Sequence, residues 1–197
     1  MVLSAGFSAR LGHPKALSRI RGTTLLRRTV RILAPLAARP IIVVLAPRAV
    51  RARAELSGHR VEFVLSRRRS QGLSASVKSA LFRAQYSAAM LILPVDLAWL
   101  ERREIARMIA RWRSSRRVVV ARHTGGQWAG APLVLPRRLY PEAWRIGGDF
   151  GLRRLVNDLP KNEVKLLAVP SATLDVDTPQ DLRRARRRLR AINSRSR

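Results

Sequence analysis

The segment LSAGFSARLGHPK, residues 3–15, combines small residues with two cations directly after an apolar start. Val2 and Leu3 are typical of the end of a buried strand, and the small residues that follow allow backbone N–H groups to approach phosphate oxygens. Arg10 and Lys15 can neutralise a triphosphate and the charge that develops at an attacked phosphorus. The glycine spacing fits neither a P-loop nor a dinucleotide-binding fingerprint. The segment predicts a phosphate-binding loop or, alternatively, a tight strand-to-helix turn with two solvated cations.

Apolar segments rich in β-branched residues alternate with amphipathic segments along the rest of the chain. The expected strands are residues 2–3, 40–45, 60–65, 89–93, 117–121 and 165–169, and the expected helices are residues 23–36, 74–85 and 101–112 with a last helix from Thr178-Pro179. In the helix over residues 23–36, apolar residues recur at helical spacing, which leaves Arg27, Arg28 and Arg31 on the expected solvent face. This alternation predicts an α/β fold with a mostly parallel sheet covered by helices on both faces.

The length of 197 residues suits one domain, which we expect to span residues 1–192, followed by a disordered basic tail at residues 193–197. The glycine-rich residues 122–132 are a candidate excursion from the sheet. A buried central strand normally needs about five residues, yet only Met1 to Leu3 precede the first loop. We expect either a true start upstream, which intact mass of the native product would reveal, or an unusually short strand.

Basic residues dominate the charge: 40 Lys and Arg against 12 Asp and Glu give a formal net charge of +28. Such a surface attracts polyanions, and a nucleic-acid binder is one reading. The arginines are spread along the whole chain, however, and aromatic residues make up only 5%, too few for a base-stacking platform. Nucleic acid is therefore not the expected physiological partner.

Other compositional features indicate a soluble protein. The chain has no cysteine, which excludes disulfides and thiolate metal sites. It has no secretory signal pattern and no apolar run of the roughly 18 residues that suggest a membrane span. We expect a cytoplasmic protein that does not engage a membrane and is a monomer or a small homo-oligomer.

Residues 3–15 resemble the signature of the MobA-like nucleotidyltransferases, L-A-A-G-x-S-x-R-M-G-x-x-K, and especially the molybdenum cofactor cytidylyltransferase branch; Ser4 and Leu11 are small departures. The resemblance implies a Rossmann-like, doubly wound sheet of the nucleotide-diphospho-sugar transferase type. It also implies that the loop wraps the nucleoside triphosphate, that Arg10 and Lys15 hold its phosphates as catalytic residues, and that the nucleotide is bound by Leu3, Ser4, Ala5 and Gly6.

Residues 71–76, QGLSAS, resemble the E-G-M-S-x-S turn of the same family. The resemblance implies that Gly72, Ser74 and Ser76 lie near the nucleotide, and a helix N-terminus is a physical anion site. For Ser74 taken alone, an ordinary helix N-cap explains the residue equally well.

Two remote acidic segments resemble the metal-binding elements of the family. Asp96, in LPVDL at residues 93–97, follows a hydrophobic run and so lies at the carboxyl end of a strand, where open α/β sheets bind ligands. DVDTPQDL at residues 175–182 resembles the family's D-I-D-T-P-E-D-L. We expect Asp96 to be a catalytic residue and the first Mg²⁺ ligand, with Asp175 or Asp177 as the second. For Asp96 alone the other reading is a turn or cap residue, and for Asp177 it is a cap on the following helix.

On the acceptor side, GGDFG at residues 147–151 resembles the family's G-D-x-G turn, where Asp149 either contacts the acceptor or caps its own helix. Residues 130–132, GAP, depart from the usual G-H-P of the cytidylyltransferase branch, so Ala131 stands where a histidine is expected. The three histidines His13, His59 and His123 lack metal-ligand spacing.

The resemblance implies a Mg²⁺-dependent enzyme that transfers a nucleoside monophosphate to a phosphorylated acceptor and releases pyrophosphate. CTP and molybdopterin are the implied pair, because Ala5 before Gly6 is the family's usual choice for a pyrimidine nucleotide. One alternative keeps the chemistry with a sugar phosphate or another alcohol phosphate as acceptor. A second alternative is a basic nucleic-acid-binding module that has kept the fold and lost turnover.

Overall fold

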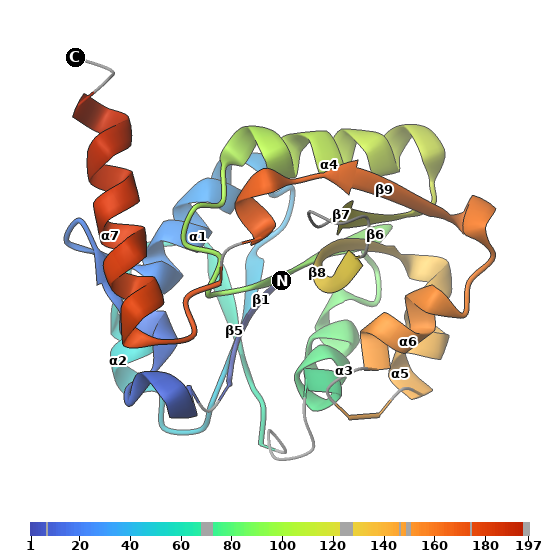
Figure 1. The fold of residues 1–197 in the computed structure, drawn as a ribbon. Coiled ribbons are helices and arrows are strands. Elements are labelled where there is room, and N and C mark those ends of the chain that lie inside the picture. Colours follow the sequence, from blue (N-terminus) through green and yellow to red (C-terminus); the bar gives the residue numbers. More distant parts are fainter. Residues whose placement is uncertain are drawn as a thin grey trace.

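The computed structural model describes residues 1–6, 8–67, 73–122, 128–145, 147–148, 151–173 and 175–194. A seven-stranded sheet in the order β5-β4-β1-β6-β8-β7-β9 forms its centre (Figure 1). The strands are β1 (Val2–Ser4), β4 (Ile41–Leu45), β5 (Val61–Leu65), β6 (Ala89–Pro94), β7 (Val118–Arg122), β8 (Trp128–Pro136) and β9 (Val164–Ala168). The expected α/β fold with a doubly wound, mostly parallel sheet is confirmed.

The strand β8 is antiparallel to both its neighbours, β6 and β7, whereas every other pairing in this sheet is parallel. The expectation that residues 122–132 leave the sheet is therefore wrong for residues 128–132, which open β8. Gly130 and Pro132 suggest a loop by their local propensity, but Leu133 and Val134 pair with both β6 and β7 and hold the segment inside the sheet.

Seven α-helices pack around the sheet in the described part of the chain. They are α1 (Leu25–Leu33), α2 (Val50–Ala54), α3 (Leu73–Ala84), α4 (Arg102–Ser115), α5 (Tyr140–Arg145), α6 (Gly151–Asn157) and α7 (Pro179–Ser194). Figure 1 shows α3, α5 and α6 gathered on one side, with α1 and α4 on the other. None of the helices in the described ranges combines the length and the apolarity that crossing a bilayer requires.

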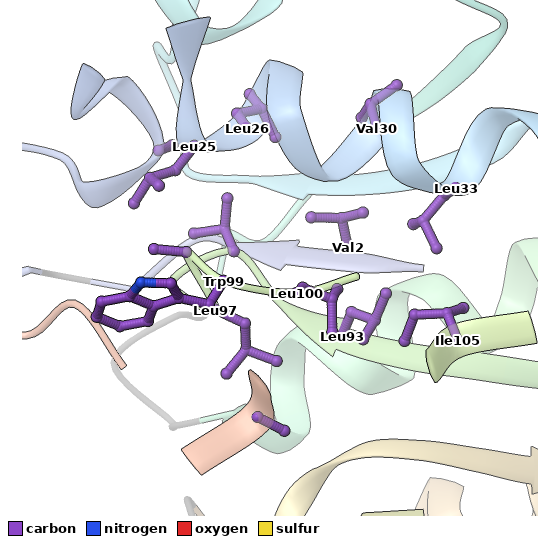
Figure 2. Close-up of a cluster of buried hydrophobic side chains, with 14 of the residues drawn as sticks. Val2, Leu25, Leu26, Val30, Leu33, Leu93, Leu97, Trp99, Leu100 and Ile105 are labelled. Carbon is purple, nitrogen blue, oxygen red and sulfur yellow. The ribbon is translucent and has the colours of Figure 1, made fainter. Parts of the chain in front are cut away.

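Side chains of the central strands point alternately to the two faces of the sheet, and this divides the core into two clusters, one on each face. Val2 and Leu93 belong to the cluster beneath α1 and α4, whereas Leu3 and Ile92 belong to the cluster beneath α3, α5 and α6. Successive side chains of a strand point to opposite faces, so each three-to-six-residue strand supplies both layers. Figure 2 shows the first cluster, in which side chains of α1 lie over Val2 and the residues that follow β6.

Local capping explains where the helices on the first face begin. Thr24 precedes α1, and its hydroxyl accepts a hydrogen bond from the backbone N–H of Arg27 at 3.2 Å. Glu101 and Glu104 form a capping box at the start of α4. Glu104 is buried, and the backbone N–H and hydroxyl of Ser171 also donate to its carboxylate, which compensates its burial.

The expected solvent face of α1 needs a correction. Arg31 is exposed, but Arg27 and Arg28 are half-buried. The Nε of Arg28 donates to the backbone carbonyl of Ala98 at 2.9 Å, so this side chain lies against the segment that follows β6. Helical spacing places a residue on a face but does not show which neighbouring segment covers that face.

Candidate active site

Asp96 and the segment 175–177 meet at the carboxyl edge of the sheet. The N–H of Val95 donates to the carbonyl of Leu3 at 3.1 Å, which continues the contact between β1 and the chain leaving β6. Leu97 and Asp175 form an antiparallel bridge, and the N–H of Val176 donates to the carbonyl of Asp96 at 3.1 Å. Backbone hydrogen bonds therefore bring these remote carboxylates to the end of β1, where the small-residue loop begins.

The loop after β1 folds back through short 3₁₀ turns at Ala9–Leu11 and Lys15–Leu17. Gly12 has φ 74°, a left-handed conformation that favours glycine. The hydroxyl of Ser8 accepts a hydrogen bond from the backbone N–H of Lys15 at 3.0 Å, which closes the loop. This closure turns the Lys15 side chain toward the two acidic segments.

Lys15 lies between two carboxylates from distant parts of the chain. Its ammonium donates to Asp96 Oδ2 at 2.9 Å and also to Asp177 Oδ1. Arg10, largely exposed, pairs with the other oxygen of Asp177 at 3.2 Å. Burial alone lowers the pKa of Lys15, but the charges of Asp96 and Asp177 and their hydrogen bonds outweigh it, so the pKa is raised above its ordinary value. Lys15 is therefore a fixed cation at neutral pH.

Asp175 stands beside this network. Desolvation of its carboxyl, and then the negative charges of Asp96 and Asp177, raise the pKa of Asp175 to about 6, while Lys15 acts in the opposite direction. The residue as a whole is exposed, so solvent screens part of this effect. The raised pKa reflects first the burial of the carboxyl and then its closeness to the carboxylates of Asp96 and Asp177.

A pocket of about 310 Å³ opens at the network. Its lining includes seven residues that the sequence predicts as site residues: Leu3, Ser4, Gly6, Arg10, Lys15, Asp96 and Asp177. Sequence reasoning gave no role to Ser8 and Pro14, which also line it, although Ser8 is the serine of the loop signature. Ala5 is buried next to these residues, and Asp175 lies beside the pocket without lining it.

The serines of α3 are placed differently from the loop residues. Ser74 lies in the first turn of α3, which begins at Leu73, and its N–H donates to the carbonyl of Gly148 at 3.3 Å. The hydroxyl of Ser76 is buried and donates to the hydroxyl of Ser66 at 3.1 Å, which ties α3 to the end of β5. Neither serine lines the pocket.

Other predicted site residues fall outside the pocket or outside the described part of the chain. Gly72 and Asp149 lie outside the described residues. Ala131 lies in β8, so the departure from G-H-P falls on a strand of the sheet. The roles of Gly72 and Asp149 in binding the nucleotide and the acceptor therefore remain predictions.

The oxygen atoms that line the pocket fit a hard divalent cation that is also coordinated by the substrate. Asp96 Oδ1 is buried and has no hydrogen-bond partner among the described residues, and the hydroxyl of Ser4, another lining residue, has none either. Within the described ranges, no group of three or more His, Asp or Glu side chains is arranged to hold a metal ion by itself. Mg²⁺ is commonly held by one or two carboxylates together with substrate phosphates, and Asp96 and Asp177 can supply that pair.

The match to a family model places the protein among the nucleotidyltransferases. The chain belongs to the MobA-like NTP transferase domain family, whose model matches residues 1–164. The family resemblance drawn from residues 3–15 and the later motifs is thus confirmed.

Relatives and solved structures extend the similarity over almost the whole chain. A probable molybdenum cofactor guanylyltransferase of Opitutus terrae is 29% identical over 195 residues, which cover 95% of this chain and 94% of the relative. Rv0371c of Mycobacterium tuberculosis H37Rv is 31% identical with a TM-score of 0.77, over 94% of this chain and 96% of that one. A structure of Rv0371c in complex with manganese has 28% identity and a TM-score of 0.74, over 94% and 96% of the two chains.

Proposed function

We propose that the protein transfers a nucleoside monophosphate from a nucleoside triphosphate to a phosphorylated acceptor of the molybdopterin type. The observation that carries the proposal is the convergence of Arg10, Lys15, Asp96 and Asp177 on one pocket at the carboxyl edge of the sheet. The molybdenum cofactor guanylyltransferase of Opitutus terrae supports the acceptor class, since it is similar over nearly its full length.

In the proposed reaction, an oxygen of the acceptor phosphate attacks the α-phosphorus, and the bond from this phosphorus to the bridging oxygen breaks. The electron pair of that bond leaves with pyrophosphate, so no covalent enzyme intermediate is required. Arg10 and Lys15 bind the phosphates and neutralise the charge that develops during the attack. Backbone N–H groups of the loop at residues 3–6 orient the triphosphate for in-line attack.

A divalent cation, with Mg²⁺ as the expected ion, would be held by Asp96 and Asp177 together with the substrate phosphates. When bound, it lowers the charge repulsion between the triphosphate and the incoming phosphate. The manganese complex of Rv0371c supports a divalent metal in this fold. The ammonium of Lys15 donates to both of these carboxylates, and in the proposed complex it would also contact phosphate oxygens.

The identity of the nucleotide base, cytosine or guanine, is a separate question. Ala5 before Gly6 favours CTP, whereas the similarity to a probable guanylyltransferase favours GTP. A direct competition decides between them: the protein, Mg²⁺ and molybdopterin are mixed with equal CTP and GTP, and the dinucleotide product is identified by mass. A cytidine product supports the loop argument, and a guanosine product overturns it.

Pyrophosphate release tests the reaction itself. We expect release only when Mg²⁺, a nucleoside triphosphate and the molybdopterin acceptor are all present. Release with a sugar phosphate in place of molybdopterin would favour the alternative acceptor class, to which the loss of histidine at Ala131 gives weight. A folded protein that releases no pyrophosphate with any triphosphate and acceptor would contradict the proposed function.

A further inference from the structure

Glu104 is a buried carboxylate that joins two segments far apart in the chain. It lies in the first turn of α4 and is only 5% exposed. Its Oε2 accepts a hydrogen bond from the backbone N–H of Glu101 at 3.2 Å, and its Oε1 accepts one from the backbone N–H of Ser171 at 3.1 Å. The hydroxyl of Ser171 donates to Oε2 as well. The carboxylate therefore connects the start of α4 to the 3₁₀ turn Pro170–Thr173, which follows β9.

The two segments that Glu104 joins carry the acidic residues of the active site. Asp96 lies between β6 and α4, and residues 175–177 lie between the 3₁₀ turn and α7. Near the pocket, these segments are already joined by the antiparallel bridge of Leu97 and by the hydrogen bond to the Asp96 carbonyl. Glu104 joins them a second time, at a point that does not line the pocket. Two separate attachments fix the relative placement of the segments, whereas one attachment would leave a hinge.

A helix cap alone does not explain the environment of Glu104. In a capping box the side chain at the third helical position accepts from the N-cap backbone, and the contact with Glu101 meets this requirement. Burial of a carboxylate costs free energy unless hydrogen bonds compensate it, so a solvent-facing side chain would cap α4 at a lower cost. The three donors that the structure shows for Glu104 are all neutral, and two of them belong to Ser171. The link to Ser171 therefore accounts for the burial.

We propose that Glu104 is a positioning residue of the active site, which fixes the spacing between the segments that carry Asp96 and Asp177. The inference rests on the proposed function, since it takes these two aspartates as the ligands of the divalent cation. Mg²⁺ requires a nearly ideal arrangement of its oxygen ligands, so its affinity depends on how firmly the two carboxylates are held. Residues that orient metal ligands without touching the metal typically change its affinity by about 10- to 100-fold when they are replaced.

The variant Glu104→Gln separates the link to Ser171 from the helix cap. Glutamine keeps one acceptor oxygen, which is sufficient to cap α4, but its amide nitrogen is a donor and cannot accept from the N–H of Ser171. We expect the backbone amides of Val176 and Asp177, followed by NMR, to exchange hydrogen at least about fivefold faster, because the turn before them loses an anchor. Exchange at Ile41, the first residue of β4, should not change.

The metal requirement is the second readout. We expect the Mg²⁺ concentration for half-maximal pyrophosphate release to rise at least about tenfold in Glu104→Gln, with little change in the rate at saturating Mg²⁺. Ser171→Ala removes only the hydroxyl bond, so its fold should be intact, and it should shift both readouts in the same direction by less. Glu101→Ala is the matched control: it removes the side chain of the N-cap residue of α4 and leaves all three donors to Glu104 in place. Both readouts should match the wild type in this control.

Wild-type exchange at Val176 and Asp177 in Glu104→Gln, or equal acceleration in Glu101→Ala, would overturn the inference. Faster exchange with an unchanged Mg²⁺ requirement would also overturn it, since Glu104 would then stabilise the fold without positioning the metal ligands. Hydrogen exchange needs neither substrate nor turnover. A wild-type protein that releases no pyrophosphate would therefore contradict the proposed function, while exchange would still show whether Glu104 holds the two segments together.

Discussion

The two carboxylate oxygens of Asp96 lie in different environments. Oδ2 accepts from Lys15 at 2.9 Å, whereas Oδ1 is buried without a partner among the described residues. We expect Asp96→Ala to lower Mg²⁺-dependent pyrophosphate release by at least about 10³-fold, because a metal on the phosphates contributes several kcal/mol to stabilising the transition state. The fold should remain intact, since Lys15 keeps Asp177 as a partner.

Asp158→Ala is the matched control for this variant. The Asp158 side chain is 71% exposed at the end of α6 and pairs only loosely with Arg154, at 3.7 Å, so its loss should leave turnover and melting temperature nearly unchanged. If Asp96→Ala is folded by circular dichroism and still turns over at the wild-type rate, the assignment of Asp96 to the metal is wrong.

Asp175 gives the site a defined dependence of stability on pH. Its pKa of about 6 in the folded protein lies above the ordinary value of 3.8, so between these values the folded state binds more protons than the unfolded state. The contribution of Asp175 to the free energy of unfolding is therefore present at low pH and falls as pH rises through about 6. We therefore expect the free energy of unfolding of Asp175→Asn, relative to that of the wild type, to increase as the pH rises from 4.5 to 7.5. Urea denaturation at several pH values measures this difference.

Turnover of the same variant separates the two candidate second ligands. Asp177 lines the pocket and Asp175 does not, so Asp175→Asn should retain much more activity than Asp177→Asn. A stability difference that is constant across this pH range would contradict the raised pKa. Equal losses of turnover in the two variants would contradict the choice of Asp177 as the ligand.

At the scale of the element, the start of α7 holds the second acidic segment in place. Thr178 Oγ accepts from the backbone N–H of Asp181 at 3.2 Å, and the Asp181 carboxylate accepts from the backbone N–H and the hydroxyl of Thr178 at 2.9 and 2.7 Å. We expect Thr178→Ala to lower the free energy of unfolding by about 1 kcal/mol, the usual cost of a lost N-cap, in urea denaturation at neutral pH.

Activity should fall in the same variant, because the Asp181 carboxylate also accepts from the backbone N–H of Asp177 at 3.3 Å. Ser79→Ala is the control: it removes a hydroxyl that donates to the Ala75 carbonyl inside α3, far from the α7 cap in sequence. If both variants lose the same small amount of stability and keep full turnover, the cap does not position Asp177.

The strands and long helices were predictable because their apolar periodicity is local. The β2–β3 hairpin was not, since each of its strands has only two residues and Arg21-Gly22 at its turn carries no strong hairpin signal. The strand β8 was missed because it contains glycine and proline and depends on pairing with both β6 and β7. Such pairing is a tertiary property that overrides local propensity.

The candidate site shows the same division between local and long-range information. Family motifs identified Lys15, Asp96 and either Asp175 or Asp177, and the structure brings Lys15, Asp96 and Asp177 together. Their direct ion pairs were not predicted, because Lys15 and Asp177 are 162 residues apart and motifs give no side-chain contacts. The role of Ser76 in holding Ser66 was hidden for the same reason.

At the scale of the whole molecule, a net charge of +28 makes binding to polyanions unavoidable at low salt, whatever the reaction. Most of this charge is solvent-facing arginine, and exposed charges are screened by salt. Lys15, whose side chain is 19% exposed and flanked by two carboxylates, is screened less. Salt should therefore separate surface binding from catalysis.

We expect RNA binding, measured by filter retention, to weaken at least about tenfold between 50 and 200 mM salt, because released counterions drive such association. Pyrophosphate release should change much less over the same range. Lys15→Ala should abolish release yet leave RNA binding almost unchanged, since it removes one of 40 basic residues. The opposite result would be pyrophosphate release that Lys15→Ala does not affect, together with RNA binding that stays tight at high salt. The basic surface would then be the functional one, and the pocket at the end of β1 would have no catalytic role.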